Sequence, residues 1–117
     1  MLITLTGRRT QRQYTIPVRY LKSADAVWTF TSAEYRWWKN LKDGAAVTLR
    51  LQGKDRSYRA EAVAAPDKVR TALREFLTHY PQDAPYYDIR LGPDRRPSEG
   101  DLERASTRTI WVRAYPQ

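Results

Sequence analysis

A basic stretch near the N-terminus is the first group of residues whose types suggest chemistry. Thr6-Gly7-Arg8-Arg9-Thr10 places a glycine, two arginines and a hydroxyl in one predicted turn. Gly7 can adopt a positive φ, which lets consecutive turn amides converge on an anion, and guanidinium groups pair with phosphate oxygens. We therefore predict that Arg8, Arg9 and Thr10 contact a phosphate group. A basic hairpin tip that only faces solvent is the alternative.

Hydroxyl side chains at the end of a later strand form the second candidate group. Trp28-Thr29-Phe30-Thr31-Ser32 alternates like a strand and runs into a predicted helix start. A planar ligand lying along such a strand end can bond to its amides and to Thr29, Thr31 and Ser32. A helix start also favours anionic groups. Ordinary helix capping is the alternative interpretation of these hydroxyls.

Two adjacent tryptophans form the third candidate group, within Arg36-Trp37-Trp38-Lys39-Asn40-Leu41. Neighbouring residues of a helix point about 100° apart. Trp37 and Trp38 therefore cannot both face one core. We expect one of them to border a groove, a cofactor or a subunit interface, unless each packs against a different neighbour.

The positive charge of the chain lies in its first half. The 117 residues carry 21 Lys+Arg and 13 Asp+Glu, a net charge of +8. Residues 1–22 hold five bases and no acid, whereas residues 61–117 hold nine of each. This asymmetry favours an anionic partner of the first half, either a nucleic acid or a phosphorylated small molecule. A solvated basic face that only aids solubility is the alternative.

The residue types that are missing exclude several kinds of site. The chain has no Cys and only one His, His79, so it has no disulfide, thiolate nucleophile or His-rich metal site. We expect no bound metal, and we interpret His79 as structural. No apolar run reaches the roughly 18 residues of a membrane span, and no apolar region of the kind found in signal peptides follows Met1, so we expect neither a membrane span nor a signal peptide. We expect one cytoplasmic domain that occupies residues 1–117.

The elements that position these residues are predicted from alternation, turn signals and helix signals. Pro17 interrupts the second strand, which is therefore expected at a sheet edge or with a bulge. The six predicted strands span residues 2–6, 13–21, 26–31, 46–51, 56–63 and 107–115. We predict a mostly β (α+β) fold, a six-stranded, largely antiparallel barrel with two short helices closing its openings.

Two helices and a long connection complete this prediction. Thr31 and Glu34 have capping-box spacing, so the first helix is expected to begin after Thr31 and to end at Gly44 as the left-handed C-cap residue. The second helix spans residues 66–79, beginning at Pro66, and one helical turn is expected over 101–105. Residues 81–100 are predicted as a connection. Tyr86 and Tyr87 are expected to anchor it to the core, or alternatively to border a substrate pocket.

The opening residues resemble a known family. Leu5-Thr6-Gly7-Arg8-Arg9-Thr10, followed by Tyr14 and Pro17-Val18-Arg19-Tyr20, is similar to the first hairpin of split β-barrel flavin and deazaflavin oxidoreductases. The deazaflavin-dependent nitroreductase and quinone reductase group is the most similar. Trp38-Lys39-Asn40-Leu41 and Val47-Thr48-Leu49 resemble the family's helix and next strand. Gln11 stands where the family usually has glycine.

The resemblance implies a site for a phosphorylated flavin-type cofactor, either deazaflavin or FMN. It assigns phosphate contact to the turn at Arg8, and ring contact to the end of the strand that precedes the first helix. The implied cofactor-binding residues are Arg8, Arg9, Thr10, Tyr20, Thr29, Thr31, Ser32, Trp37, Trp38 and Lys39. A homodimer is also implied, because split barrels of this kind often hold their cofactor at a subunit interface.

The resemblance implies hydride transfer from the cofactor to a small planar substrate, a quinone- or nitroaromatic-like acceptor. Such an oxidoreductase needs no side-chain nucleophile, because the cofactor carries the chemistry. One alternative is a basic barrel that binds single-stranded nucleic acid through interleaved aromatics. It is disfavoured, because Trp28 and Phe30 alternate like core residues. Another alternative is a cofactor-free barrel that serves as an assembly module.

Overall fold

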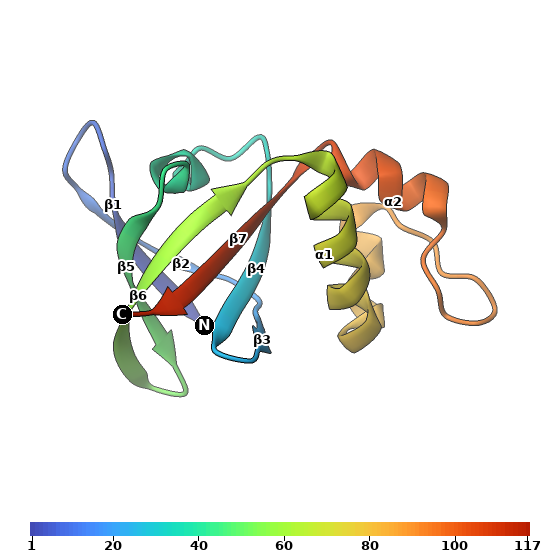
Figure 1. Ribbon diagram of the computed structural model, residues 1–117, viewed down its shortest axis with the longest axis horizontal. Helices are drawn as coiled ribbons and strands as arrows, with labels where there is room; N and C mark the ends of the chain where they lie inside the picture. The colour runs from blue at the N-terminus through green and yellow to red at the C-terminus, as the bar shows by residue number, and fades with distance from the viewer.

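A curled antiparallel sheet forms the body of the molecule, and helices cover one end of it (Figure 1). The structure is a computed structural model that describes residues 1–117. The strands lie in the order β2-β1-β5-β6-β7-β4-β3, and every neighbouring pair is antiparallel. The strands are β1 (Leu2–Thr6), β2 (Gln13–Pro17), β3 (Leu21–Ser23), β4 (Ala26–Ser32), β5 (Ala45–Leu51), β6 (Lys54–Val63) and β7 (Thr109–Pro116).

The sheet has seven strands, so the expected six-stranded count is wrong, although the mostly β, antiparallel class is confirmed. The predicted strand over residues 13–21 is two strands, β2 and β3, which lie at opposite edges of the sheet. Pro17 pairs with Leu2 at the start of β1, but it lacks an N–H and so donates no hydrogen bond to the ladder. The chain leaves β1 at this point and crosses to β4, and it resumes pairing only at Leu21.

Residues 18–20, the strap, connect these two edges and bring the curled sheet close to a barrel. On one side, the Val18 N–H donates to the Met1 carbonyl at 2.9 Å. On the other, the Thr29 hydroxyl donates to the Arg19 carbonyl at 2.6 Å. These bonds satisfy backbone groups that would otherwise face an open edge. The strap also brings Arg19 to the helical end of the molecule.

Alternating apolar residues of the strands fill the barrel. Ile3, Leu5, Val47 and Leu49 are almost fully buried, and Leu41 reaches them from the short 3₁₀-helix η1 (Trp37–Leu41). Full burial of one such side chain contributes about 1.5–3 kcal/mol relative to exposure. This core positions the β1–β2 turn and η1 at the same end of the barrel.

The first helix does not form as predicted. β4 continues through Ser32, and Thr31 pairs with Ile110 of β7 instead of capping a helix. Strand pairing buries Thr31, and a single cap bond cannot compensate for losing that ladder. The Ser32 hydroxyl instead accepts the Glu34 N–H at 3.2 Å, in a turn that leads to η1. Gly44 does adopt the predicted left-handed conformation, with φ +81°.

The helical end of the molecule contains the second helix, which forms where it was predicted. α1 (Pro66–His79) begins at a proline and buries Leu73, Phe76 and Leu77 in one stripe, as the spacing predicts. Residues 81–100 contain more secondary structure than the predicted connection. They contain the 3₁₀-helix η2 (Pro81–Tyr87), a Leu91–Pro97 bridge and the start of α2 (Glu99–Ser106). The predicted helical turn over 101–105 is therefore a longer helix. At 14 residues, α1 is the longest helix, and none has the length and hydropathy of a membrane-spanning segment.

The buried carboxylate of Asp101 fastens α2 to the segment that follows η2. Its Oδ2 accepts the Arg90 backbone N–H at 3.0 Å and the Arg90 Nε at 3.1 Å, and its Oδ1 bonds with Arg104. The backbone amide of Arg90, together with its guanidinium, holds the pKa of Asp101 below its usual range. Ionised Asp101 therefore stabilises the helical end.

Acid titration tests this role of Asp101. Because its pKa is lowered by folding, Asp101 stabilises the fold above the unfolded aspartate pKa of 3.8, and this contribution is lost as the pH falls through the folded-state value. We expect Asp101→Asn to be less stable at neutral pH and to lose less stability below about pH 4. Urea unfolding at several pH values measures both effects. Asp25→Asn, in an exposed turn, is the control, and an unchanged acid limb in Asp101→Asn would contradict this role.

Candidate functional site

Among the cavities that open on the molecule, two share Trp37 as a lining residue. The first, here called the basic cavity, has a volume of about 800 Å³. It is lined by Gly7, Arg8, Arg9, Thr10, Tyr14, Arg36, Trp37, Lys39, Asn40 and Lys42. The second, the aromatic cavity, has a volume of about 860 Å³ and lies between the strap, the end of β4 and η2. A single elongated ligand could therefore contact Trp37 from both sides.

The β1–β2 turn forms one wall of the basic cavity, and Asn40 of η1 holds it in place. The Asn40 Oδ1 accepts the Arg8 N–H at 2.9 Å, while its Nδ2 donates to the Trp37 carbonyl at 2.9 Å. Within the turn, the Gly7 N–H donates to the Arg12 carbonyl at 2.7 Å. The amide of Asn40 therefore links two segments that are far apart in the sequence.

Gly7 is needed for space and not for a positive φ, which corrects the expectation for this turn. A Cβ at Gly7 would lie 2.8 Å from a ring carbon of Tyr14 and 2.9 Å from the Thr10 hydroxyl. The left-handed residue is Gln11, with φ +58°, at the position where the resembled family usually has glycine. The turn thus keeps a backbone shape that favours glycine, although Gln11 carries a side chain.

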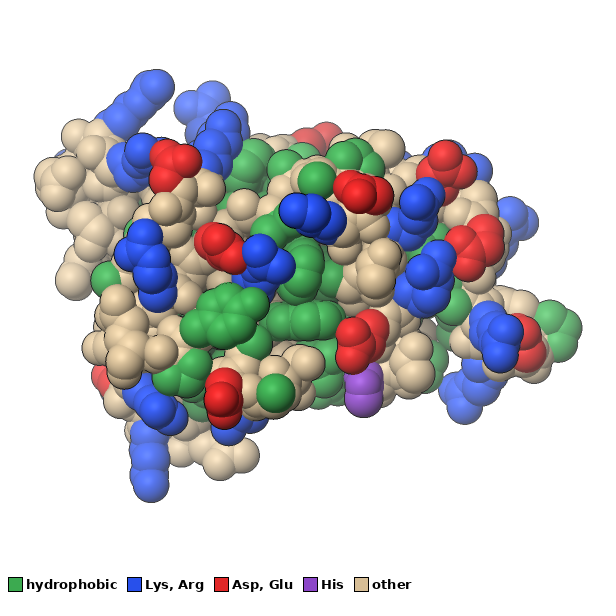
Figure 2. Space-filling view, in the orientation of Figure 1, with side chains coloured by type: hydrophobic (Ala, Val, Ile, Leu, Met, Phe, Trp, Pro, Cys, Tyr) green, Lys and Arg blue, Asp and Glu red, His purple; other side chains and the backbone are tan.

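The basic cavity is strongly positive. Five of its lining residues are Lys or Arg, and none is Asp or Glu. Arg8 lies 3.3 Å from Asp43, but both side chains are largely exposed, at 56% and 82%. Such an exposed pair contributes little and leaves Arg8 free to bind a ligand. Figure 2 shows Lys and Arg side chains gathered where the β1–β2 turn and η1 lie. These groups suit phosphate or another polyanion.

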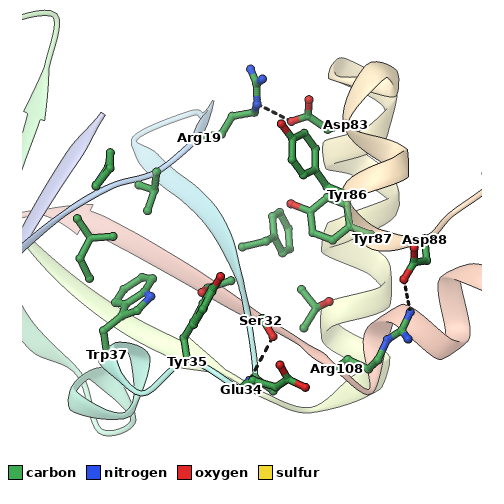
Figure 3. A pocket seen from close by; sticks show the side chains of 17 residues that line it. Arg19, Ser32, Glu34, Tyr35, Trp37, Asp83, Tyr86, Tyr87, Asp88 and Arg108 are labelled. Carbon is green, nitrogen blue, oxygen red and sulfur yellow. Dashed lines mark hydrogen bonds and ion pairs between the residues drawn. The ribbon is translucent and has the colours of Figure 1, made fainter.

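The aromatic cavity has apolar walls and a charged rim (Figure 3). Phe30 and Trp37 lie on the barrel side, and Tyr86 and Tyr87 project from η2. Tyr87 packs edge-on against Phe30, with ring centroids 6.4 Å apart. Burial and the nearby Asp83 carboxylate raise the pKa of Tyr87, so its phenol stays protonated at neutral pH. The cavity can therefore accept a planar ring and donate a hydrogen bond to it.

Two ion pairs connect η2 to the barrel at this cavity. The Nε of Arg19, from the strap, lies 2.6 Å from the Oδ2 of Asp83, whose side chain is 4% exposed. Arg108, just before β7, lies 3.6 Å from Asp88, the left-handed residue that ends η2. A buried carboxylate needs a paired cation, so Asp83 depends on Arg19. The strap and η2 therefore hold each other in position.

The structure brings most of the predicted site residues together. The basic cavity contains Arg8, Arg9, Thr10 and Lys39, and the aromatic cavity contains Thr31 and Ser32. Trp37 lines both cavities, while Trp38 is buried in the barrel core, so the prediction that the two tryptophans separate is confirmed. The remaining predicted residues that line neither cavity are Tyr20, Thr29 and Trp38.

These three residues have structural contacts. The Thr29 hydroxyl bonds to the strap, the Trp38 Nε1 donates to the Ala33 carbonyl at 3.4 Å, and Tyr20 packs against the barrel core. Their proposed contact with a cofactor is therefore not supported by the cavities.

Sequence reasoning gave no role to several residues of the site. Asn40 belongs to the two-tryptophan stretch and to the family resemblance, but its link to Arg8 depends on a contact 32 residues away. Asp83 and Asp88 lie in a proline-rich segment that carries no catalytic pattern. The one pattern that could have pointed to this segment is Tyr86-Tyr87-Asp88, an acidic residue next to two tyrosines after a predicted helix.

The half-barrel with a strongly positive cavity beside an aromatic one defines a split-barrel protein, whose two cavities together suit a phosphorylated ligand with a planar ring. A family model described as "F420H(2)-dependent quinone reductase" matches residues 1–96. The chain therefore belongs to this family of deazaflavin-dependent oxidoreductases, and the family resemblance predicted from the sequence is confirmed.

One solved structure shares this fold at low sequence identity, and a second is a weaker match. The FAD and heme binding protein from Mycobacterium smegmatis matches with a TM-score of 0.60 and 15% identity, over 99% of this chain and 60% of that one. The flavocytochrome Anf3 from Azotobacter vinelandii matches with a TM-score of 0.48 and 13% identity, over 99% and 61%. This chain thus spans about three-fifths of each of these proteins. No curated protein matches the sequence significantly.

The Asn40 link between η1 and the β1–β2 turn can be tested by substitution. Asn40→Ala removes two hydrogen bonds, so we expect it to lower the free energy of unfolding by about 1–3 kcal/mol. It should also weaken the binding of pyrophosphate, measured by calorimetry, because the turn that carries Arg8 is released. Thr4→Val is the control, since it removes a hydroxyl pair in the same hairpin but away from the turn. Equal pyrophosphate affinity in Asn40→Ala and the wild type would contradict this role.

Proposed function

We propose that this protein uses a deazaflavin cofactor to reduce a quinone by hydride transfer. The observation that carries the proposal is the junction at Trp37, where a cavity with five cations meets a cavity with aromatic walls. A phosphorylated cofactor with a planar ring has an anionic end that matches the first cavity and a flat end that matches the second. Family membership supports deazaflavin over FMN. It also favours an oxidoreductase over the nucleic-acid-binding and assembly alternatives.

The residues present fit such a cofactor. Arg8, Arg9 and Lys39 supply charge-assisted donors for its phosphate, and the Thr10 hydroxyl supplies a further donor. Hydrogen bonds of this kind contribute about 1.5–3 kcal/mol each where the acceptor is charged. No carboxylate lines the basic cavity to repel the phosphate. The chemistry of the donor set therefore agrees with the family.

The protein contributes position and electrostatics to the reaction. When bound, the reduced deazaflavin supplies the hydride that the acceptor receives. Ser32 and the neighbouring backbone orient the planar ring, while Phe30 and Trp37 exclude water from its surroundings. Tyr87 keeps its proton at neutral pH and can donate a hydrogen bond to an acceptor oxygen. The open mouth of the cavity lets the final proton come from solvent.

Reduction of nitroaromatic acceptors, assembly as a homodimer and a cytoplasmic location are further predictions of this proposal. No group of three or more His, Asp or Glu side chains is arranged to bind a metal.

A direct assay tests the proposal. The purified chain should bind the family's deazaflavin cofactor more tightly than FMN, and should oxidise the reduced form only when a naphthoquinone is added. Absorbance of the cofactor follows the reaction, and equilibrium dialysis measures binding. Absence of both binding and quinone-dependent oxidation would refute the proposed function.

Paired arginine substitutions test the role of the basic cavity. We expect Arg8→Ala with Arg9→Ala to weaken deazaflavin binding by about 10- to 100-fold, because two charge-assisted contacts are lost. The effect should shrink at high salt, which screens exposed charges. Arg95→Ala with Arg96→Ala changes the net charge equally on an exposed loop at the other end of the molecule. Equal affinity losses in the two double variants would show that only overall charge matters.

A further inference from the structure

A third cavity lies at the helical end of the molecule, between η2, α2 and the loop of residues 91–97 that precedes α2. We call it the arginine groove, and its volume is about 920 Å³. Figure 1 shows the loop projecting beyond α2, far from the β1–β2 turn. The groove shares only one residue, Asp88, with the aromatic cavity and none with the basic cavity. Its charged lining residues are Asp88, Arg90, Arg95, Asp101 and Arg104.

Asp101 holds two guanidinium groups in place at this groove. Its side chain is 3% exposed, whereas the side chains of Arg90 and Arg104 are 84% and 65% exposed. Because one carboxylate bonds to both arginines, both guanidinium groups are oriented before any ligand binds. A guanidinium has five N–H donors, and Asp101 accepts only some of them. The remaining donors of the two arginines are available to a second anion.

Arg95 is the arginine of the groove that forms no ion pair and no side-chain hydrogen bond. Its φ of +63° lies in the left-handed region, which favours glycine. The loop imposes this conformation, since the Arg95 N–H donates to the Gly92 carbonyl at 2.8 Å and the Gly92 N–H donates to the Arg96 carbonyl at 2.9 Å. A side chain is unfavourable at such a position. Because the guanidinium makes no contact within the chain that compensates, we infer that it serves a ligand.

The groove carries two positive charges that its own acids do not balance. Asp88 is paired with Arg108, which lies outside the groove, at 3.6 Å. Asp101 is therefore the one acid that faces the three arginines of the groove. The two excess charges come from different elements, one from the arginines around Asp101 and the other from Arg95 in the loop. They match two neighbouring carboxylates, one at each place.

The shape of the groove favours a macromolecule over a small ligand. Small-molecule sites enclose most of their ligand, whereas the arginines here are largely exposed. The groove is also a poor match for a nucleic acid or pyrophosphate. Such polyanions prefer dense positive charge, which the basic cavity offers with five cations and no acid. A protein segment with spaced carboxylates is the partner that agrees with both the openness and the charge.

We propose that the arginine groove binds an acidic, extended segment of a partner protein. One carboxylate pairs with Arg90 and Arg104, and a neighbouring carboxylate pairs with Arg95. Arginine pairs with carboxylates through two parallel hydrogen bonds and is enriched among the residues that dominate protein interfaces. Asp101 and Arg104 lie beyond residue 96, where the family match ends. The groove is thus separate from the proposed cofactor site and does not depend on the proposed function.

Binding is tested with a fluorescent peptide of four consecutive glutamates flanked by glycines. Anisotropy at low salt should show binding to the full chain, whereas the same peptide with glutamines should not bind. Pyrophosphate, added at constant ionic strength, occupies the basic cavity and should not displace the peptide. Amide NMR locates the site, and we expect the peptide to shift the signals of Arg90, Arg95 and α2.

Substitutions of Arg95 separate a ligand contact from a structural role. Arg95→Ala should weaken binding of the glutamate peptide by about three- to tenfold, because one charged contact is lost at an exposed site, and Arg95→Lys should weaken it less. Arg95→Gly should bind as weakly as Arg95→Ala but unfold at a higher urea concentration, since glycine relieves the left-handed backbone. Lys68→Ala, an exposed residue of α1 outside these cavities, is the charge-matched control.

Several outcomes would overturn this proposal. Equal binding of the glutamate and glutamine peptides, or equal affinity of Arg95→Ala and Lys68→Ala, would remove the role of the arginines. Peptide-induced shifts confined to the β1–β2 turn would assign the glutamates to the basic cavity. Larger shifts in α2 with a short oligothymidylate than with the peptide would assign the groove to nucleic acid. These measurements use no deazaflavin, so their failure is distinct from failure of the proposed function.

Discussion

The site depends on one crossing of the chain, where the strap of residues 18–20 passes from one edge of the sheet to the other. β2 and β3 are consecutive in sequence but lie at opposite edges, so the strap must span the gap between them. Hydrogen bonds to Met1 and Thr29 hold it on both sides. The strap forms one wall of the aromatic cavity and carries Arg19 to Asp83. Without this crossing, η2 would lose its buried ion pair and the cavity would lose two of its walls.

Part of the excess positive charge of the protein is concentrated around one cavity. A net charge of +8 alone could indicate nucleic acid binding, but the excess bases are gathered in part around the β1–β2 turn and η1. A few residues away, the aromatic cavity balances its arginines with carboxylates. Glu34 lines the aromatic cavity, and Arg36, two residues later, lines the basic cavity. The boundary between the two environments therefore falls within this short segment. This boundary coincides with Trp37, where a cavity lined by five cations adjoins a cavity with aromatic walls.

The sequence predicted local features better than distant contacts. The α1 stripe, the Gly44 turn and the separation of Trp37 from Trp38 follow from periodicity and backbone geometry, which act over a few residues. The capping box at Thr31 failed because pairing with β7, far along the chain, buried that residue in the sheet. Pro17 predicted an interruption of the second strand. Nothing in the sequence predicted that the chain would then cross to the other edge of the sheet. The Arg8–Asn40 and Arg19–Asp83 contacts join distant segments and carry no spacing signal.

The central claim is that one ligand lies across Trp37, with its phosphate in the basic cavity and its ring in the aromatic cavity. Amide NMR of the 117-residue chain tests this claim directly. Titration with the deazaflavin cofactor should shift the amide signals of Arg8 to Thr10, those of Ser32 to Tyr35 and the Trp37 indole, all with one dissociation constant. Inorganic pyrophosphate should shift only the first set. Cofactor-induced shifts confined to one cavity, or centred on α2, would contradict the account.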